Sequence, residues 1–185
     1  MQLPIHTLET APTDSRPVLD GIAADLGLVP NLAAVAASSP ALVAGFDGLR
    51  RAVQGTGLDP VLREVAGLTV GVAVDNRYGV AFHSTMLAGL GVDEADIEAI
   101  RAGAPPAAPA AAAVHALAGE VVLRRGAVAD ETADAARRAG LSDEAILEVV
   151  LECAFATMVG LVDNLAGHVA LDGFLAPRAW EPPAA

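Results

Sequence analysis

Two ionisable side chains, Glu64 and His83, are spaced so that one site could hold both. Each is expected on its own helix, and a short break at 75–77 separates the two helices. If the helices fold back at this break, Glu64 lies about 16 Å along the axis from the turn and His83 about 10 Å, at about 1.5 Å per residue. The offset of about 6 Å is within reach of the two side chains, directly or through one water. A carboxylate beside an imidazole indicates general acid–base chemistry near neutral pH.

The expected substrate-binding residues lie on the helix of His83. Gly79 and Asn76 precede His83 by four and seven residues, so the three share one helix face. Gly79 has no side chain and is expected to leave a hollow one turn below the imidazole. The helix start at Asn76 offers free N–H groups to an anion. Tyr78, the only tyrosine, adds a phenol, and Arg77 could bind a carboxylate at the mouth of the pocket.

Each of these residues also has a structural explanation that needs no catalysis. Glu64, in the first turn of its helix, stabilises the helix dipole whatever else it does. Asn76 suits a helix N-cap, and Arg77 suits a solvated turn. His83 can be a hydrogen-bonded interior histidine, and Tyr78 can simply pack in the core.

No metal site and no cofactor are predicted. The sequence lacks the His-x-x-x-His and Glu-x-x-His spacings in which helical ligands commonly occur. One cysteine excludes an intramolecular disulfide framework and a cysteine-rich metal or cluster site. That residue, Cys153, falls inside an apolar helical stretch and is expected to be a buried structural residue.

The elements that must position these residues are all predicted to be helices. Asp59 suits an N-cap with Pro60 in the first turn, and the uncharged stretch 65–74 is typical of a helix buried on all sides. This helix and the next one, near 78–88, form the expected hairpin. Further helices are expected from Ser15 to Gly27 and over 31–37, 41–53, 93–101, 110–125, 130–139 and 143–162, continuing over 165–175 after a bend. No alternating stretch is long enough for a strand, so the predicted class is all-α.

The expected organisation is one domain, residues 15–175, between an N-terminal arm, 1–14, and a flexible tail, 176–185. The domain contains a weak internal sequence repeat. Val-Asp-Asn occurs at 74–76 and 162–164, and Leu-Glu-Val-Val at 147–150 is similar to Arg-Glu-Val-Ala at 63–66. Duplication of a helical hairpin and chance explain this repeat about equally well.

Composition excludes several classes of partner. The formal charge is −12 and every basic residue is an arginine, so nucleic acid and anionic membrane surfaces are not expected partners. Hydrophobic residues make up 54% and charged residues 18%, which excludes disorder for most of the chain. The long uncharged run 102–119 contains three prolines, so no membrane span is expected. A soluble cytoplasmic protein is the expectation.

The spacing of Glu64, Asn76, Gly79 and His83 on two consecutive helices resembles the signature of the AhpD-like/carboxymuconolactone decarboxylase superfamily. Gly-Leu-Val-Pro-Asn (27–31), Ser-Ser-Pro-Ala-Leu (38–42), Leu-Arg-Glu-Val (62–65) and Val-Asp-Asn-Leu-Ala (162–166) resemble landmarks of its longer peroxidase-related members. The resemblance covers roughly residues 15–175. It implies an all-α, AhpD-like helical bundle with a hairpin core that assembles as a homotrimer or homohexamer.

The sequence departs from this family at the redox motif. The alkylhydroperoxidase-like members have a Cys-x-x-Cys pair where this chain has Asn76 and Gly79. Peroxide reduction of that type needs an attacking thiolate and a resolving thiol. The resemblance therefore implies roles for Glu64 and His83 and does not imply thiol peroxidase activity.

The resulting prediction is a cofactor-independent decarboxylase, lyase or isomerase acting on a small oxygenated organic acid or lactone. His83 would transfer the proton, Glu64 would orient it, and Tyr78, Asn76, Gly79 and Arg77 would bind the substrate. One alternative is a non-catalytic ligand-binding or scaffold member of the family, and a second is an antioxidant protein working without the thiol pair. A separation of Glu64 and His83 beyond about 8 Å, too far for one bridging water, would favour the scaffold.

Overall fold

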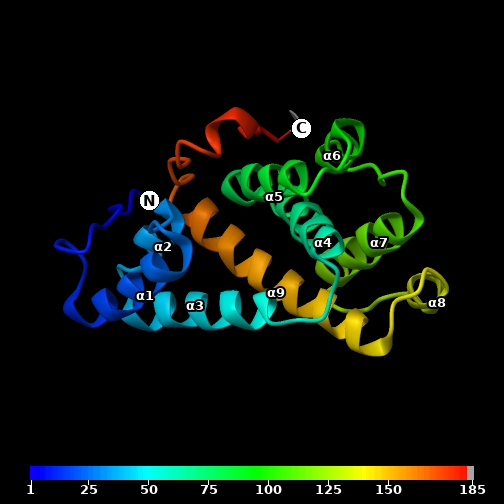
Figure 1. The fold of residues 1–185 in the computed structure, drawn as a ribbon, viewed down its shortest axis with the longest axis horizontal. Helices are drawn as coiled ribbons and strands as arrows, with labels where there is room; N and C mark the ends of the chain where they lie inside the picture. The colour runs from blue at the N-terminus through cyan, green and yellow to red at the C-terminus, as the bar shows by residue number, and fades with distance from the viewer. Residues whose placement is uncertain (183–185) are drawn as a thin grey trace.

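The computed structural model describes residues 1–182, and throughout this part of the chain it contains helices and no strand (Figure 1). The predicted all-α class is confirmed. The α-helices are α1 Arg16–Leu26, α2 Asn31–Ala36, α3 Pro40–Gln54, α4 Pro60–Ala73, α5 Arg77–Gly89, α6 Glu94–Arg101, α7 Pro109–Leu123, α8 Asp130–Arg138 and α9 Asp143–Leu165. Two short 3-10 helices, η1 Thr13–Ser15 and η2 Ala176–Arg178, lie near the ends.

The hairpin of α4 and α5 forms as predicted and lies at the centre of the fold. The side chain of Asp59 accepts hydrogen bonds from the first amides of α4, and Pro60 is its first residue. The turn to α5 passes through Asp75, whose φ of 53° is left-handed. α4 packs against α5, α7 and α9, and it is buried without interruption from Glu64 to Gly71. An uncharged sequence therefore lies where no face of the helix meets water.

α9 is the longest helix and crosses the middle of the molecule (Figure 1). Within residues 1–182 it is the one helix long and apolar enough to cross a membrane. It contacts α2, α3, α4, α5 and α7, as a central helix of a folded domain does. The opposite face is apolar but exposed, with Leu147, Leu161 and Leu165 at 68%, 66% and 60% exposure.

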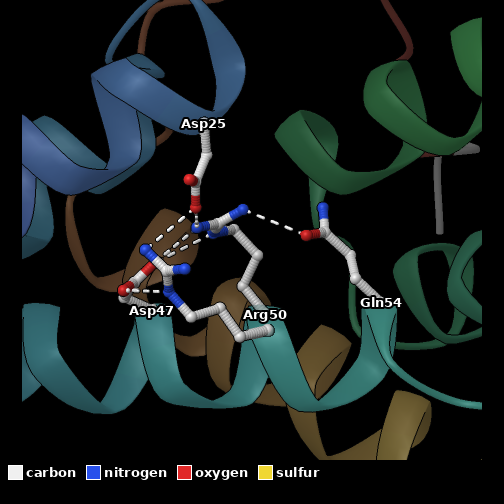
Figure 2. A network of polar contacts seen from close by, with 5 residues as sticks. Asp25, Asp47, Arg50 and Gln54 are labelled. Atoms are coloured by element: carbon white, nitrogen blue, oxygen red, sulfur yellow. Dashed lines mark hydrogen bonds and ion pairs between the residues drawn. The ribbon is translucent and has the colours of Figure 1, made fainter.

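Two hydrophobic clusters form the interior. One comes from α4 to α9 together with Trp180, and the other comes mainly from α1, α2 and α3, the start of α5 and the end of α9. A polar network fixes α1 on α3: Arg50 donates to Asp25 at 2.7 Å, to Asp47 at 2.6 Å and to Gln54 at 3.1 Å (Figure 2).

Three predicted segments differ from the structure. Ser15, expected to cap the first helix, stands at the N-cap position of α1 without a side-chain capping bond, because its buried hydroxyl donates to the carbonyl of Ala37 at 2.7 Å. The segment after Leu165 does not continue as a helix, because the chain turns through left-handed residues at Gly167 and His168.

The tail expected to be flexible is packed over residues 176–182. Trp180 is only 9% exposed and joins the core, and Arg101 donates to the carbonyls of Arg178 and Ala179. The remainder of the predicted tail, 183–185, lies outside the described residues.

Candidate active site

Glu64 and His83 meet in the interior of the hairpin. Nδ1 of His83 lies 2.8 Å from Oε2 of Glu64, and both side chains are buried. Because a carboxylate can only accept, Nδ1 donates the hydrogen and Nε2 is left for another partner. The ring fits because Gly67 on α4 has no side chain: a Cβ atom there would lie 2.2 Å from Cε1 of His83. Two helix backbones and one glycine thus set the position of the imidazole.

A third ionisable side chain, Glu152 of α9, faces the free nitrogen of His83. Its Oε1 lies 3.8 Å from Nε2, and the residue is 2% exposed. Oε1 is buried without a hydrogen-bond partner. Arg63 closes the other end of the group by donating to Oε1 of Glu64 at 3.2 Å. The site therefore contains two carboxyl groups, one imidazole and one guanidinium.

The environment separates the proton affinities of these groups. Burial favours the neutral form of Glu64, but the hydrogen bond and charge of His83, with help from Arg63, hold its pKa below the usual value. Burial opposes charge on His83 as well, yet Glu64 and the charge of Glu152 raise its pKa. Burial raises the pKa of Glu152 to about 7, against the opposing charge of His83. Glu64 therefore stays ionised near neutral pH, whereas Glu152 titrates there.

These groups open onto an apolar cavity of about 400 Å³ between the two hydrophobic clusters. Side chains of α2, α3, α4, α5 and α9 line it, together with the segment after α1 and Phe174. Its volume falls in the range of small-molecule sites, about 300–1,000 Å³. A mostly apolar wall with a few converging polar groups is the arrangement such sites share.

The structure brings only some of the predicted substrate-binding residues to this cavity. Tyr78 lines it, but its hydroxyl donates to Asp172, and burial raises the pKa of the phenol far above its usual value. Gly79 also lines it, although the space beside its Cα is filled by Asn76 rather than left hollow. Asn76 is buried and caps α5 by accepting from the amide of Gly79 at 2.8 Å.

Arg77 lies away from the cavity lining and pairs with Glu181 in the C-terminal segment. Its side chain therefore helps to hold that segment against α5. Among the residues proposed from the sequence, Glu64, His83, Tyr78 and Gly79 reach the cavity.

Sequence reasoning missed Glu152, although the weak internal repeat pairs it with Glu64. When the two Val-Asp-Asn triplets are aligned, Glu64 falls on Glu152. The comparison of 63–66 with 147–150 uses a different offset and points to Glu148 instead. The two glutamates at equivalent positions in α4 and α9 face the two nitrogens of His83.

Two further expectations concern metal and thiol chemistry. Within residues 1–182, no three His, Cys, Asp or Glu side chains gather in a group that could hold a metal ion. Cys153 is buried, and burial raises the pKa of its thiol to about 12, helped by the charge of Glu152. A buried, protonated thiol is a poor nucleophile.

Two residues of the site, Glu64 and His83, lie within a segment similar to a known family. Residues 40–119 match the Carboxymuconolactone decarboxylase family, and this range includes Glu64 and His83. No curated protein matches the chain.

Solved structures match nearly the whole chain. A peroxidase-related protein from Ralstonia eutropha JMP134, described as an alkylhydroperoxidase AhpD core, is 21% identical with a TM-score of 0.79 and 97% of both chains covered. A variant of the debrominase Bmp8 in complex with 2,3,4-tribromopyrrole is 19% identical with a TM-score of 0.72, covering 94% of this chain and 96% of the other.

A third structure supports the same fold. A peroxidase-related protein from Silicibacter sp. TM1040 is 16% identical with a TM-score of 0.71, and the match covers 94% of this chain and 91% of the other. The fold of the whole chain is therefore AhpD-like, as the sequence resemblance predicts. Together with the family match over 40–119, this fold agrees with the resemblance of the sequence to the AhpD-like/carboxymuconolactone decarboxylase superfamily.

Proposed function

We propose that this protein is an enzyme that moves a proton on a small organic molecule, in a decarboxylation, lyase or isomerase reaction. The observation that supports this most directly is the 2.8 Å hydrogen bond between Glu64 and His83 beside a cavity. It is far shorter than the separation of about 8 Å at which a scaffold would be favoured.

The three ionisable groups have distinct roles in this proposal. Glu64 holds the imidazole by Nδ1 and stabilises its charged form, which leaves Nε2 as the atom that takes or gives the proton. Glu152, with a pKa of about 7, is a second acid on the same side of the ring as Nε2. An imidazole whose pKa is raised and an acid whose pKa is about 7 can remove a proton from one atom of a substrate and return one to another.

The solved relatives support a small-molecule occupant. One relative of this fold holds 2,3,4-tribromopyrrole, and others are described as peroxidase-related. Thiol-dependent peroxide reduction is not part of the proposal, because the one cysteine, Cys153, is buried and lies on α9 away from the Asn76–Gly79 motif.

The test is hydrogen–deuterium exchange at carbon, followed by NMR in D₂O, with a panel of small carboxylic acids, ketones and lactones. His83→Gln should lower the exchange rate of an accepted compound by about 10²–10⁴-fold, the usual contribution of a proton-transfer group. Glu64→Gln should lose less, because it removes orientation and charge stabilisation only. The double variant should be little worse than His83→Gln, since the two residues act as a unit.

Two results would count against the proposal. If His83→Gln unfolds the protein while the folded fraction keeps its activity, His83 is a core residue only. If the unmodified protein exchanges no proton on any compound, a non-catalytic binding protein becomes the better description.

A further inference from the structure

The aromatic residues of this chain are concentrated at one place. The sequence has four phenylalanines, one tyrosine and one tryptophan, only 3% of the residues. All four phenylalanines and the tyrosine line the cavity of Glu64 and His83. They come from α3, α5, α9 and the segment after α9: Phe46, then Tyr78 and Phe82, then Phe155, then Phe174. The remaining core is aliphatic apart from Trp180, so the rings are gathered where a ligand would contact them.

The rings offer both edges and faces. Phe46 and Phe155 lie 5.3 Å apart with their planes tilted by 57°. Phe82 lies edge-on to His83 at 5.2 Å, with an interplanar angle of 88°. Phe174 also lines the cavity and is 43% exposed to solvent. Such offset and edge-to-face arrangements are those in which a further aromatic ring is held best.

Most polar groups elsewhere in the cavity are already bonded. Arg50 donates to Asp25, to Asp47 and to Oε1 of Gln54, which leaves the amide nitrogen of Gln54 for a ligand (Figure 2). The hydroxyl of Tyr78 donates a hydrogen bond to Asp172. A ligand with many oxygens would therefore place several of them against phenylalanine rings, where each loses its hydrogen bonds to water.

At the polar end, Glu152 lacks a partner. Its Oε1 is buried without a hydrogen bond, beside Nε2 of His83, and the residue lines the cavity. An unsatisfied buried carboxyl oxygen is costly, so a ligand atom that bonds to it gains affinity. Arg63 balances the charge of Glu64, and Glu152 faces His83, so a neutral hydroxyl or carbonyl group is enough to complete the site.

We propose that the cavity binds a flat aromatic or conjugated molecule of one or two rings that carries one hydroxyl or carbonyl group directed at Glu152 and His83. The size fits, because a cavity of about 150 Å³ is enough for benzene, and this one measures about 400 Å³. This inference rests on the proposed function and narrows its substrate class from oxygenated acids and lactones in general to hydroxy- or oxo-substituted rings.

The experiment is a binding titration of the unmodified protein by calorimetry, with three probes. The first is 2-naphthol, the second is trans-2-decalol, its saturated counterpart, and the third is citrate. We expect 2-naphthol to bind and citrate not to bind. We expect trans-2-decalol to bind at least about fivefold more weakly than 2-naphthol, because a saturated ring makes no aromatic contacts. Equal binding of the two ring compounds, or binding of citrate alone, would overturn the inference.

Variants locate the binding. Phe82→Leu and Phe155→Leu should each lower the affinity for 2-naphthol by about two- to tenfold. Trp180→Leu changes the one aromatic residue outside the cavity and should leave the affinity of 2-naphthol unchanged. Glu152→Leu should weaken the binding of 2-naphthol but not that of naphthalene, which has no hydroxyl group. If the phenylalanine variants bind as the unmodified protein does, the probe lies elsewhere and the inference fails.

His83→Gln separates this inference from the proposed function. The variant should still bind 2-naphthol, because the rings remain, while proton exchange is lost. Binding of 2-naphthol with no proton exchange by the unmodified protein would support the ligand class and contradict the enzyme. Proton exchange on acyclic acids with no binding of 2-naphthol would support the enzyme and overturn the ligand class.

Discussion

The imidazole of His83 lies against the backbone of Gly67, so closely that a Cβ atom at position 67 would come within 2.2 Å of Cε1. The glycine therefore determines how deeply the ring enters the hairpin. Because His83 reaches Glu64 only from that depth, Gly67 is a positioning residue for the proposed proton transfer.

Gly67→Ala should displace His83 while the helix stays formed, since alanine favours an interior helical position by about 1 kcal/mol over glycine. The added methyl group displaces the imidazole so far that its hydrogen bond to Glu64 breaks. The rate of proton exchange should therefore fall at least tenfold. Loss of the 2.8 Å contact should also lower the pKa of His83, measured by NMR titration of its ring protons. Gly45→Ala on α3 is the matched control, because nothing lies within 4 Å of a Cβ there. Unchanged titration of His83 in Gly67→Ala would contradict this role.

Glu152→Gln should change how stability depends on pH. The pKa of Glu152 is raised from 4.5 to about 7 in the folded protein, so the folded state binds more protons than the unfolded state between these values. The free energy of unfolding that Glu152 contributes therefore falls as the pH rises through this window and levels off above it. An amide resembles the protonated acid, so the variant should gain in Tm over the unmodified protein between pH 5 and pH 8.

Thermal unfolding at several pH values measures this difference. Glu144→Gln, an exposed glutamate on the same helix, should follow the unmodified protein at every pH. A constant offset for Glu152→Gln across the range would mean that the carboxyl group does not titrate there.

The exposed face of α9 should be covered by further copies of the chain. Leu147, Leu161 and Leu165 share one face of α9 and are each at least 60% exposed, and such apolar surface commonly marks an interface. We expect a homotrimer or homohexamer by light scattering at micromolar concentration. Leu161→Glu should shift the mass toward the monomer, whereas Leu123→Glu, equally exposed but on α7, should not. A monomeric unmodified protein would refute the assembly.

Cys153 should be inert under native conditions. Its thiol is buried and its pKa is raised to about 12, so little thiolate forms near neutral pH. Reaction with a thiol reagent should be slow until denaturant is added, and no sustained turnover of organic hydroperoxides with a dithiol is expected. Turnover that disappears in Cys153→Ser would show that this cysteine is reactive.

The sequence alone determined the hairpin and the pairing of its two candidate site residues, Glu64 and His83. Local signals were sufficient there: Asp59 and Pro60 begin α4, Asn76 caps α5, and the uncharged stretch between them can only be buried. With both helix lengths defined, the position of Glu64 opposite His83 followed from the rise per residue. The resemblance in spacing and the all-α class depended on the same local features.

The tertiary structure decided which side chains share the site. Glu152 reaches His83 because α9 packs across α4, a contact between segments far apart in sequence that no local pattern encodes. Tyr78 is bonded to Asp172, and Arg77 to Glu181, through equally distant contacts. The gathering of the phenylalanines is likewise a property of the packed helices, because each lies in a different segment and only their common cavity relates them.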